Sequence, residues 1–388
     1  MRKGTLKNLV EHFEKQNPDN KRLAWEDAAA ELGSLFESKK VDPASISIKE
    51  AFEDLVGPVA DFQRAGPEVI AEAVHSSSFP TVTNEIINSI IIPQYETEVG
   101  SAGMIIEEGM ASKTGQDKVA GFTAADGPEM RREFMAYQEV TFGEKYITVD
   151  MADFGRMISL SREMIFDDRT GEVVRLARDI GKKAGQHRAK YIIQTLEMRS
   201  RSALGESATR GFVYNGTVVT QAQFYANTHA TVIDKQVNDN LVTDTLGPAG
   251  LKNALTLFGQ MVDENSDEIS VTPKLLIVPI ALQTDGWELL KTQLKTDTAE
   301  NNANYWGPMG PTGVSLMVSP FLQYDHFYYV GDPKSQLLWL WVWKPETLTQ
   351  GVGSDLAFSN QVLMRVRYSY NGGIAHTDYR HIVKGGSA

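Results

Sequence analysis

The chain has 388 residues, of which 42% are hydrophobic and 23% are charged, a composition typical of globular proteins rather than of disordered or membrane-spanning ones. Its 38 basic and 50 acidic residues give a net charge of −12. This charge argues against an exterior that grips duplex DNA, because phosphate binding requires clustered Lys and Arg. The chain contains no cysteine, which excludes disulfides, zinc–thiolate sites and cysteine nucleophiles.

The sequence contains no recognisable targeting or membrane segment. Residues Met1–Val10 are basic but lack the apolar core of a signal peptide. The longest apolar run, Leu275–Leu282, contains Pro279 and is far shorter than the roughly 20 apolar residues of a membrane-spanning helix. We therefore expect no membrane partner, and a protein that is made and kept in the cytosol or released by lysis.

Residues 1–92 are predicted to form short helices. Trp25, Leu32 and Phe36 recur at helical spacing, and Ser47 followed by Glu50 is a capping-box pattern at the start of another helix. Prolines interrupt the region at positions 18, 43, 58, 67 and 80. We interpret the region as an extended helical arm that packs on something other than itself. The alternative is a small helical cap on the main domain.

Residues 93–143 are rich in glycine and show little helical periodicity. Glycines fall six residues apart, at positions 103, 109, 115, 121 and 127. Because six is an even number, two such glycines on one strand share a face, where another backbone can approach closely. A segment of this length without its own core predicts an extended β loop with a function, and a floppy surface loop is the alternative.

Residues 144–240 contain the clearest regular pattern. Strands are predicted at Lys145–Val149 and Arg156–Leu160, with a turn at residues 153–155 between them. A long helix follows, from about Thr170 to Met198, in which apolar residues recur at spacings of three and four. Such a helix is on the order of 40 Å long, and we expect it to be the spine of a domain.

Residues 241–345 predict a mixed helix-and-strand domain, and residues 346–388 predict closing strands. Helices are expected at Pro248–Val262 and from Pro279 through Leu290. Strands are expected near residues 274–278, 314–318, 327–330, 337–343, 361–370 and 374–383. Residues 337–343 are apolar on both faces, which predicts a buried strand. The fold class is therefore α+β, with a helix-bearing central sheet and long excursions.

The common catalytic signatures are absent from the sequence. It has no phosphate loop, dinucleotide-binding turn, nucleophile elbow or zinc-protease motif. His376 and His381 are five residues apart on one predicted strand, so they should point to opposite faces and do not indicate a metal site. His187 lies on the apolar stripe of the long helix, where a hydrogen-bonded packing role is expected. We therefore predict no catalytic, cofactor-binding or metal-binding residue.

Basic charge is concentrated on the long helix. Between Gly171 and Arg201, eight basic and three acidic residues give a local charge of +5. Arg175, Arg178 and Lys182 share one helical face. A solvated face is one interpretation, and a contact surface for an acidic partner, either another copy's loop or enclosed nucleic acid, is the sharper one. We favour the loop, whose acidic residues are Glu107, Glu108, Asp117, Asp126 and Glu129.

The order of these elements resembles that of the major capsid proteins of tailed bacteriophages. The local phrases that carry the resemblance are Tyr146–Asp150, Phe154–Arg156 and Ser159–Ile165, the last of which contains a "Ser-Arg-Glu-Met-Ile" phrase that the family often shows just before its spine helix. Lys274–Pro279 looks like the family's buried apical strand, and Arg365–Arg380 is similar to its closing strands. The resemblance covers roughly residues 80–384. Residues 1 to about 75 have no clear match and could be an enlarged arm or a scaffold-like segment.

The resemblance implies the tailed-phage major capsid fold. Its parts would be a helical N-terminal arm (1–92), an extended two-stranded β loop (93–143), a peripheral domain with the spine helix (144–240), an apical domain (241–345) and the closing strands of the peripheral domain (346–388). It also implies a structural protein without enzymatic activity, whose copies form the pentamers and hexamers of an icosahedral shell around double-stranded DNA. The protein would be assembled in the host cytoplasm and located in the virion.

The partners that the resemblance implies are many copies of the chain itself, with portal, scaffold and decoration proteins as further candidates. DNA would be enclosed without sequence-specific binding. Subunit contacts are expected in the loop, on the spine helix and in a peripheral loop near residues 349–358. The contact residues that we predict are Glu107, Glu108, Asp117, Lys118, Asp126, Glu129, Arg131, Arg132, Arg175, Arg178, Lys182, Gly351 and Gly353.

Two other interpretations of the sequence are kept. The first is the shell protein of an encapsulin-like bacterial nanocompartment with the same fold, although such subunits tend to be shorter and to lack a long helical arm. The second is an acidic cytosolic enzyme of an unrecognised family, which would need a pocket that the motifs do not reveal.

Overall fold

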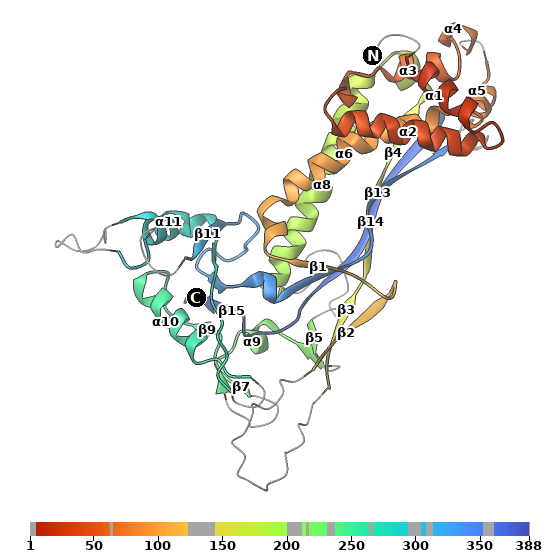
Figure 1. Cartoon of the computed structure of the whole chain (residues 1–388). Coiled ribbons are helices and arrows are strands. Elements are labelled where there is room, and N and C mark those ends of the chain that lie inside the picture. Colours follow the sequence, from red (N-terminus) through yellow and green to blue (C-terminus); the bar gives the residue numbers. More distant parts are fainter. Residues whose placement is uncertain are drawn as a thin grey trace. The chain divides into compact units, whose positions relative to one another are not determined.

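The computed structural model describes residues 5–62, 65–122, 144–199, 212–214, 217–230, 237–263, 267–293, 304–307, 313–351 and 361–387. The chain divides into two compact units, which are described separately (Figure 1). Unit 1 comprises residues 1–99, 153–188 and 343–371, and unit 2 comprises residues 100–152, 189–342 and 372–388. The five ranges expected from the sequence stay a prediction, since each unit combines separate stretches of the chain.

Residues 5–104 are mainly helical. The elements are α1 (Thr5–Gln16), α2 (Lys21–Glu37), η1 (Pro43–Ser45), α3 (Ile48–Leu55), α4 (Val59–Phe62), α5 (Pro67–His75) and α6 (Phe79–Met104). The predicted cap of α3 is confirmed, because the Ser47 hydroxyl accepts a hydrogen bond of 3.2 Å from the Glu50 amide. Pro43 and Pro67 begin helices, where a missing amide hydrogen removes no helical bond. These prolines therefore mark starts of helices and do not interrupt the region.

The N-terminal helices bury a core within unit 1. Phe52 is fully buried, and its ring meets those of Phe62, Phe79 and Phe166 edge to face, with 5.5 to 5.7 Å between ring centroids. Such aromatic pairs add about 0.5–1.5 kcal/mol each beyond the burial of their area. These contacts join α3, α4 and α6 to residues 162–166 within unit 1, and the choice between an arm and a cap for residues 1–92 stays a prediction.

Residues 93–104 are helical, which corrects the extended loop predicted from residue 93 onward. α6 continues through Pro93 to Met104 and is kinked at Gly100, which has φ 44° and ψ −125°. A proline inside a helix removes one backbone hydrogen bond, so it is normally read as a stop. Here the tertiary packing of α6 maintains the helix beyond Pro93.

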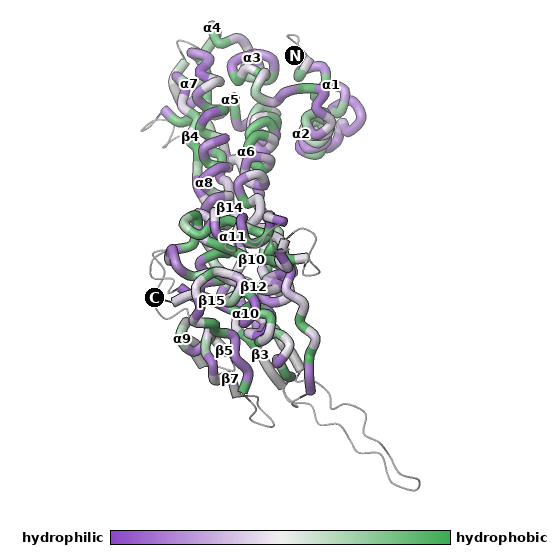
Figure 2. The backbone as a smooth tube through the Cα atoms, turned by 90° about the vertical axis from the view of Figure 1, so that its left-hand side faces the viewer, coloured by the Kyte–Doolittle hydropathy of each residue, from purple (hydrophilic) through white to green (hydrophobic). Residues whose placement is uncertain are grey.

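The predicted long helix is confirmed as α8 (Thr170–Leu196), which follows the short α7 (Arg162–Phe166). Hydrophilic and hydrophobic residues alternate along α8, as expected of an amphipathic helix (Figure 2). In unit 1, α6 and α8 approach closely at Gly181 and Gly185. A Cβ on Gly181 would lie 2.6 Å from the Ile91 carbonyl oxygen, and one on Gly185 would lie 2.5 Å from that of Tyr95. Only glycine fits this contact without moving the helices.

The strand β4 (Ala152–Ser161) contains residues 153–155, which corrects the turn predicted at that position. β4 joins β1 (Glu107–Met110), β13 (Leu337–Gly351) and β14 (Val362–His376) in a sheet of order β1-β13-β14-β4. Gly155 allows the close pairing, because an added Cβ would lie 2.9 Å from the Tyr368 carbonyl oxygen. The other predicted strand is confirmed as β3 (Glu144–Asp150), but it pairs with β2 and β5 instead of β4.

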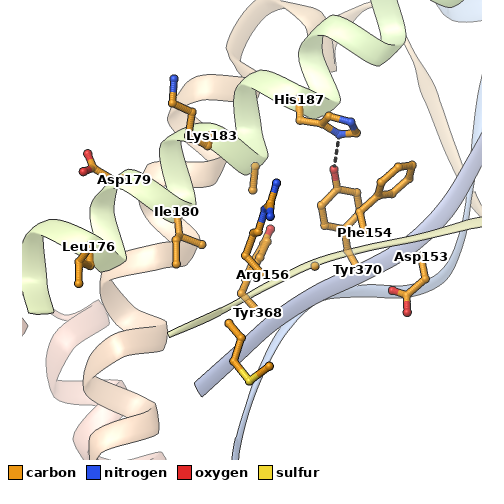
Figure 3. A pocket seen from close by; sticks show the side chains of 13 residues that line it. Asp153, Phe154, Arg156, Leu176, Asp179, Ile180, Lys183, His187, Tyr368 and Tyr370 are labelled. Carbon is orange, nitrogen blue, oxygen red and sulfur yellow. Dashed lines mark hydrogen bonds between the residues drawn. The ribbon is translucent and has the colours of Figure 1, made fainter. Parts of the chain in front are cut away.

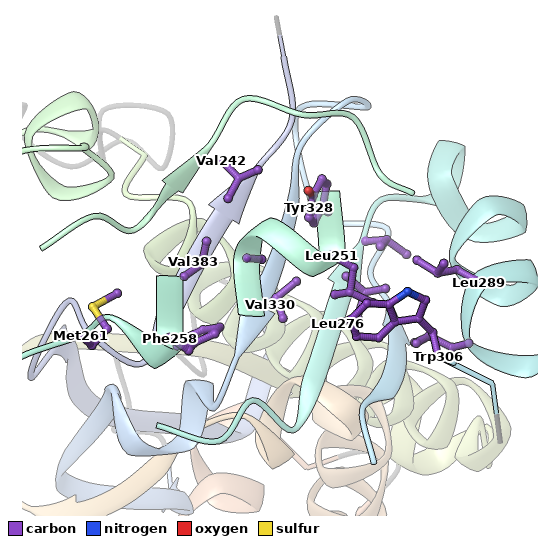
Figure 4. Close-up of a cluster of buried hydrophobic side chains, with 13 residues drawn as sticks. Val242, Leu251, Phe258, Met261, Leu276, Leu289, Trp306, Tyr328, Val330 and Val383 are labelled. Carbon is purple, nitrogen blue, oxygen red and sulfur yellow. The ribbon is translucent and has the colours of Figure 1, made fainter. Parts of the chain in front are cut away.

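Unit 2 contains a sheet of order β11-β10-β12-β15-β9. Its strands are β9 (Leu241–Val242), β10 (Leu275–Val278), β11 (Ser315–Val318), β12 (Tyr328–Gly331) and β15 (Ile382–Gly385). The helices α10 (Pro248–Gly259) and α11 (Gln283–Lys291) and the turn η3 (Ile280–Leu282) accompany it. Leu251 and Phe258 of α10 pack with Leu276 and Val330 of the sheet in a buried cluster (Figure 4). The strands predicted near residues 274–278, 314–318 and 327–330 are confirmed.

The remaining elements of unit 2 are β1 (Glu107–Met110), β2 (Gln116–Phe122), β5 (Phe212–Tyr214), β6 (Thr217–Val219), α9 (Gln221–Phe224), β7 (His229–Ala230), β8 (Val237–Asn238) and η4 (Pro333–Ser335). Trp339 of β13 is fully buried, which confirms the buried strand. The two strands predicted at 361–370 and 374–383 are wrong in extent. β14 runs unbroken to His376 and contains Gly372 and Gly373. At these two positions a side chain would collide with Trp339 and Asp150, so glycine allows the strand to continue there.

Candidate assembly surface

The charged face of α8 is the first part of the candidate surface. Arg175 and Arg178 are exposed, whereas Val173 and Ala177 on another face of the helix are buried. The Lys182 ammonium lies 4.0 Å from a Glu98 carboxylate oxygen of α6, and both belong to unit 1. Exposed ion pairs of this kind contribute only about 0–1 kcal/mol. Within the described part of the chain, Lys182 of the predicted stripe has an ion-pair partner, whereas Arg175 and Arg178 have none.

The acidic residues at the start of the predicted loop lie in a strand. β1 pairs in parallel with β13, with Glu107 opposite Leu338 and Glu108 opposite Trp339. Both residues are exposed, and the Glu108 carboxylate accepts a hydrogen bond of 3.0 Å from the Trp341 indole nitrogen. Of these two predicted contact residues, Glu108 already has a partner in its own chain.

Asp117 is used within its own turn. Its carboxylate accepts hydrogen bonds from the Ser112 amide at 2.7 Å, the Ser112 hydroxyl at 2.8 Å and the Lys118 amide at 2.9 Å. The hydrogen bond from the Ser112 amide is the main cause that holds the pKa of Asp117 below its usual value. The Lys118 ammonium lies 4.4 Å from the centre of the Tyr146 ring. Lys118 thus contacts β3 across the strand pair, whereas Asp117 stabilises the turn before β2. Sequence reasoning missed both roles.

The remaining predicted contact residues are Gly351 and five residues outside the described ranges. Gly351 is the last residue of β13. The rest lie outside the described residues, and their contacts stay predictions: Asp126, Glu129, Arg131, Arg132 and Gly353.

A cavity of about 530 Å³ lies in unit 1 beside α8 and the strands β4 and β14 (Figure 3). Its lining includes the rings of Phe154, Tyr368 and Tyr370. His187 Nδ1 and the Tyr370 hydroxyl share a hydrogen bond of 3.1 Å, which confirms the packing role predicted for His187. The sequence pointed to no cavity here, because Phe154 was placed in a turn. The recurrence of Tyr368 and Tyr370 on one strand face is the signal that could have indicated it.

Buried titratable groups surround the C-terminal end of α8 in unit 2. His376 is fully buried, and its ring bonds the Thr195 carbonyl oxygen at 2.7 Å and the Gln336 side chain at 3.0 Å. Burial lowers the pKa of His376 to about 4. Burial likewise raises the pKa of Glu197, whose carboxylate accepts a hydrogen bond from the Gln323 amide at 3.0 Å. The His376 ring thus satisfies the Thr195 carbonyl oxygen near the end of α8, which is a structural role.

The described ranges contain no group of three or more His, Asp or Glu side chains that could hold a metal ion. Within the same ranges, no helix combines the length and the apolar character needed to cross a membrane.

The model of a protein family described as "Phage capsid protein" matches residues 145–385. The chain belongs to this phage capsid protein family. The match begins at β3, includes all of α8 and ends at β15. It confirms the resemblance drawn from the sequence phrases, and it identifies the chain as a capsid structural protein rather than an enzyme. No curated protein matches the chain.

Solved structures of phage capsid proteins are similar to this capsid chain. A chain from the "Capsid of native GTA particle computed with C5 symmetry" has 13% sequence identity and a TM-score of 0.48, over 75% of this chain and 90% of that one. A chain from the "Capsid of Ralstonia phage GP4" has 11% identity and a TM-score of 0.46, over 73% and 87%. A chain from Gordonia phage Cozz has 14% identity and a TM-score of 0.44, over 74% and 86%. The family assignment rests on the match to residues 145–385.

Proposed function

We propose that the chain is the major capsid protein of a tailed phage and assembles into the pentamers and hexamers of an icosahedral shell around double-stranded DNA. The family match over residues 145–385 is the observation that carries this proposal. The net charge of −12 supports it further, because an acidic wall lets packaged DNA slide instead of adhering. Portal, scaffold and decoration proteins are the further partners that such a shell would contact.

The test is expression of the full-length chain, followed by size-exclusion chromatography and negative-stain microscopy. The proposal expects closed shells tens of nanometres wide. Nuclease-protected DNA inside particles from infected or induced cells would support a phage head, whereas protein cargo would support the nanocompartment alternative. A small, discrete oligomer with no shell under assembly conditions would contradict both.

We infer that Arg175 and Arg178 contact acidic residues of a neighbouring copy. Both side chains are exposed on α8, and the neighbour's Glu107 is exposed on β1. Opposite charges brought together across an interface set its register and speed its formation. Glu108 and Asp117 are weaker candidates for this contact, because each accepts hydrogen bonds within its own chain.

A further inference from the structure

The sheet of order β1-β13-β14-β4 has two outer strands with open edges. Within the described ranges, β1 pairs with β13 alone, and β4 pairs with β14 alone. An outer strand of a sheet presents a row of backbone N–H and C=O groups that the sheet itself does not pair. Such a row is a template for pairing with a strand of another chain.

The open edge of β4 is long and uncovered. β4 has ten residues, and Gly155, Arg156 and Met157 in its middle are all exposed. Because successive side chains of a strand point to opposite faces, three exposed residues in a row mean that neither face is fully covered there. The strand contains no proline, so every backbone amide on its open edge can donate a hydrogen bond.

The charges on β1 favour pairing with β4 over pairing with a second β1. Glu107 and Glu108 are both exposed, and two copies of β1 side by side would bring these carboxylates together. Like charges opposite each other in a sheet are destabilising, whereas opposite charges are stabilising. β4 offers Arg156, and its other charged residue, Asp153, disfavours a register shifted toward the start of β4.

Each open edge also carries an exposed methionine. Met110 of β1 is 65% exposed, and Met157 of β4 is 56% exposed. Methionine is enriched in protein–protein interfaces relative to the rest of the surface. The two edges therefore combine unpaired backbone groups, opposite charges and apolar side chains.

The edge of β4 lies beside the charged helix. Arg156 points from β4 toward α8, and Asp179 of α8 lines the same cavity (Figure 3). Arg178 directly precedes Asp179 in the helix. A strand docked on β4 would therefore lie beside the helix segment that we infer to contact Glu107 of a neighbouring copy.

We propose that β4 of one copy pairs with β1 of the next, so that this sheet continues from copy to copy. Backbone hydrogen bonds supply the pairing, and the charge pair between Arg156 and Glu107 sets its register. The contact joins two different edges, and such head-to-tail contacts close into rings when the rotation between copies allows it. The inference rests on the proposed function, because only a chain that assembles has a neighbouring copy.

Cross-linking of introduced cysteines tests the pairing, since the chain has no cysteine of its own. Met110→Cys and Met157→Cys are combined in one chain, the formation of shells is checked by negative-stain microscopy, and a short bismaleimide then links cysteines that lie close together. We expect a ladder on denaturing gels that ends at covalent pentamers and hexamers, because each copy is linked to two neighbours. The chains with only one of the two substitutions are the matched controls and should stay monomeric on the gel.

Three outcomes would overturn the pairing. Shells without a ladder would exclude it and leave the proposed function intact. Linked dimers from the chain with Met157→Cys alone would show that β4 pairs with a second β4. Absence of shells from the wild-type chain would overturn the proposed function and the pairing with it. If the double variant forms no shells, Ser159→Cys, at an exposed position two residues along β4, replaces Met157→Cys, and the same outcomes decide.

Discussion

The contact of α8 with α6 allows a prediction with a defined magnitude, namely that Gly181→Ala destabilises the protein. The added Cβ would lie 2.6 Å from the Ile91 carbonyl oxygen, about 0.8 Å short of the 3.4 Å at which ordinary contact begins. The neighbouring atom belongs to the backbone of α6, so it cannot rotate away as a side chain would. The two helices must therefore separate locally or bend.

Two opposing terms set the size of the effect. Overpacking in a well-packed region typically costs about 1–3 kcal/mol. Alanine in place of glycine favours the helix by about 1 kcal/mol. We therefore expect G181A to lower the free energy of unfolding by up to about 2 kcal/mol. A second substitution, Gly185→Ala, should add less than its own separate cost, because one separation of the helices relieves both contacts.

The assay is urea unfolding of the full-length chain, followed by helical circular dichroism. Gly171→Ala is the control on the same helix, since an added Cβ there meets no atom within 4 Å. G171A should unfold at the same urea concentration as the wild type or at a slightly higher one. If G181A unfolds at or above the midpoint of G171A, the close contact between α6 and α8 is not what glycine provides.

Three further predictions concern assembly and pH. Reversal of both Arg175 and Arg178 to Glu should block shell formation in negative-stain images, while the free energy of unfolding changes by no more than about 0.5 kcal/mol, as for other surface changes. A Lys252→Glu reversal on α10 is the control and should not block assembly. Normal assembly of the double variant would refute the contact. The stability of the wild type should fall as the pH is lowered from 6.5 to 4, because the buried His376 ring, with a pKa of about 4, stays neutral while His376 of the unfolded chain takes up a proton. His376→Gln should remove this part of the pH dependence of the urea midpoint. A pH dependence unchanged from wild type would contradict this role. Asp117→Asn should lower the free energy of unfolding by about 1–2 kcal/mol near neutral pH, because it weakens the hydrogen bonds to Ser112 and Lys118, and amide hydrogen exchange in β2 and β3 should become faster. Since the pKa of Asp117 is lowered, the difference from wild type should shrink as acid protonates the carboxylate. Equal exchange rates at pH 7 would exclude this role.

Local sequence patterns predicted the elements whose faces are marked by periodicity. α8 carries apolar residues at spacings of three and four and was found nearly to its ends. β10 and β12 are short apolar runs between breaks and were also found. The prediction failed where an element continues past a glycine or a proline. A loop was predicted from residue 93 onward although α6 continues to Met104, and two strands were predicted at 361–370 and 374–383 although β14 runs unbroken to His376.

The candidate surface shows the same division. The sequence placed Arg175 and Arg178 on one face of a helix, and both are exposed. It could not tell that Asp117 bonds to Ser112 or that Lys182 pairs with Glu98, because hydrogen-bond partners depend on turn geometry and on the packing of α6. The cavity beside α8 combines residues more than two hundred positions apart, from Phe154 to Tyr370, and no local pattern joins them.

The amino-acid sequence by itself determined that this is an acidic, cysteine-free α+β protein with a long charged helix, and its phrases near residues 146–168 indicated a phage capsid protein. These properties follow from composition and from periods of two and 3.6 residues, which are local. Only the tertiary structure decided which prolines begin helices, which glycines hold backbones together, and which charges are already paired. Each of those outcomes depends on a neighbour that is distant along the chain, and the packing of that neighbour overrides the local preference.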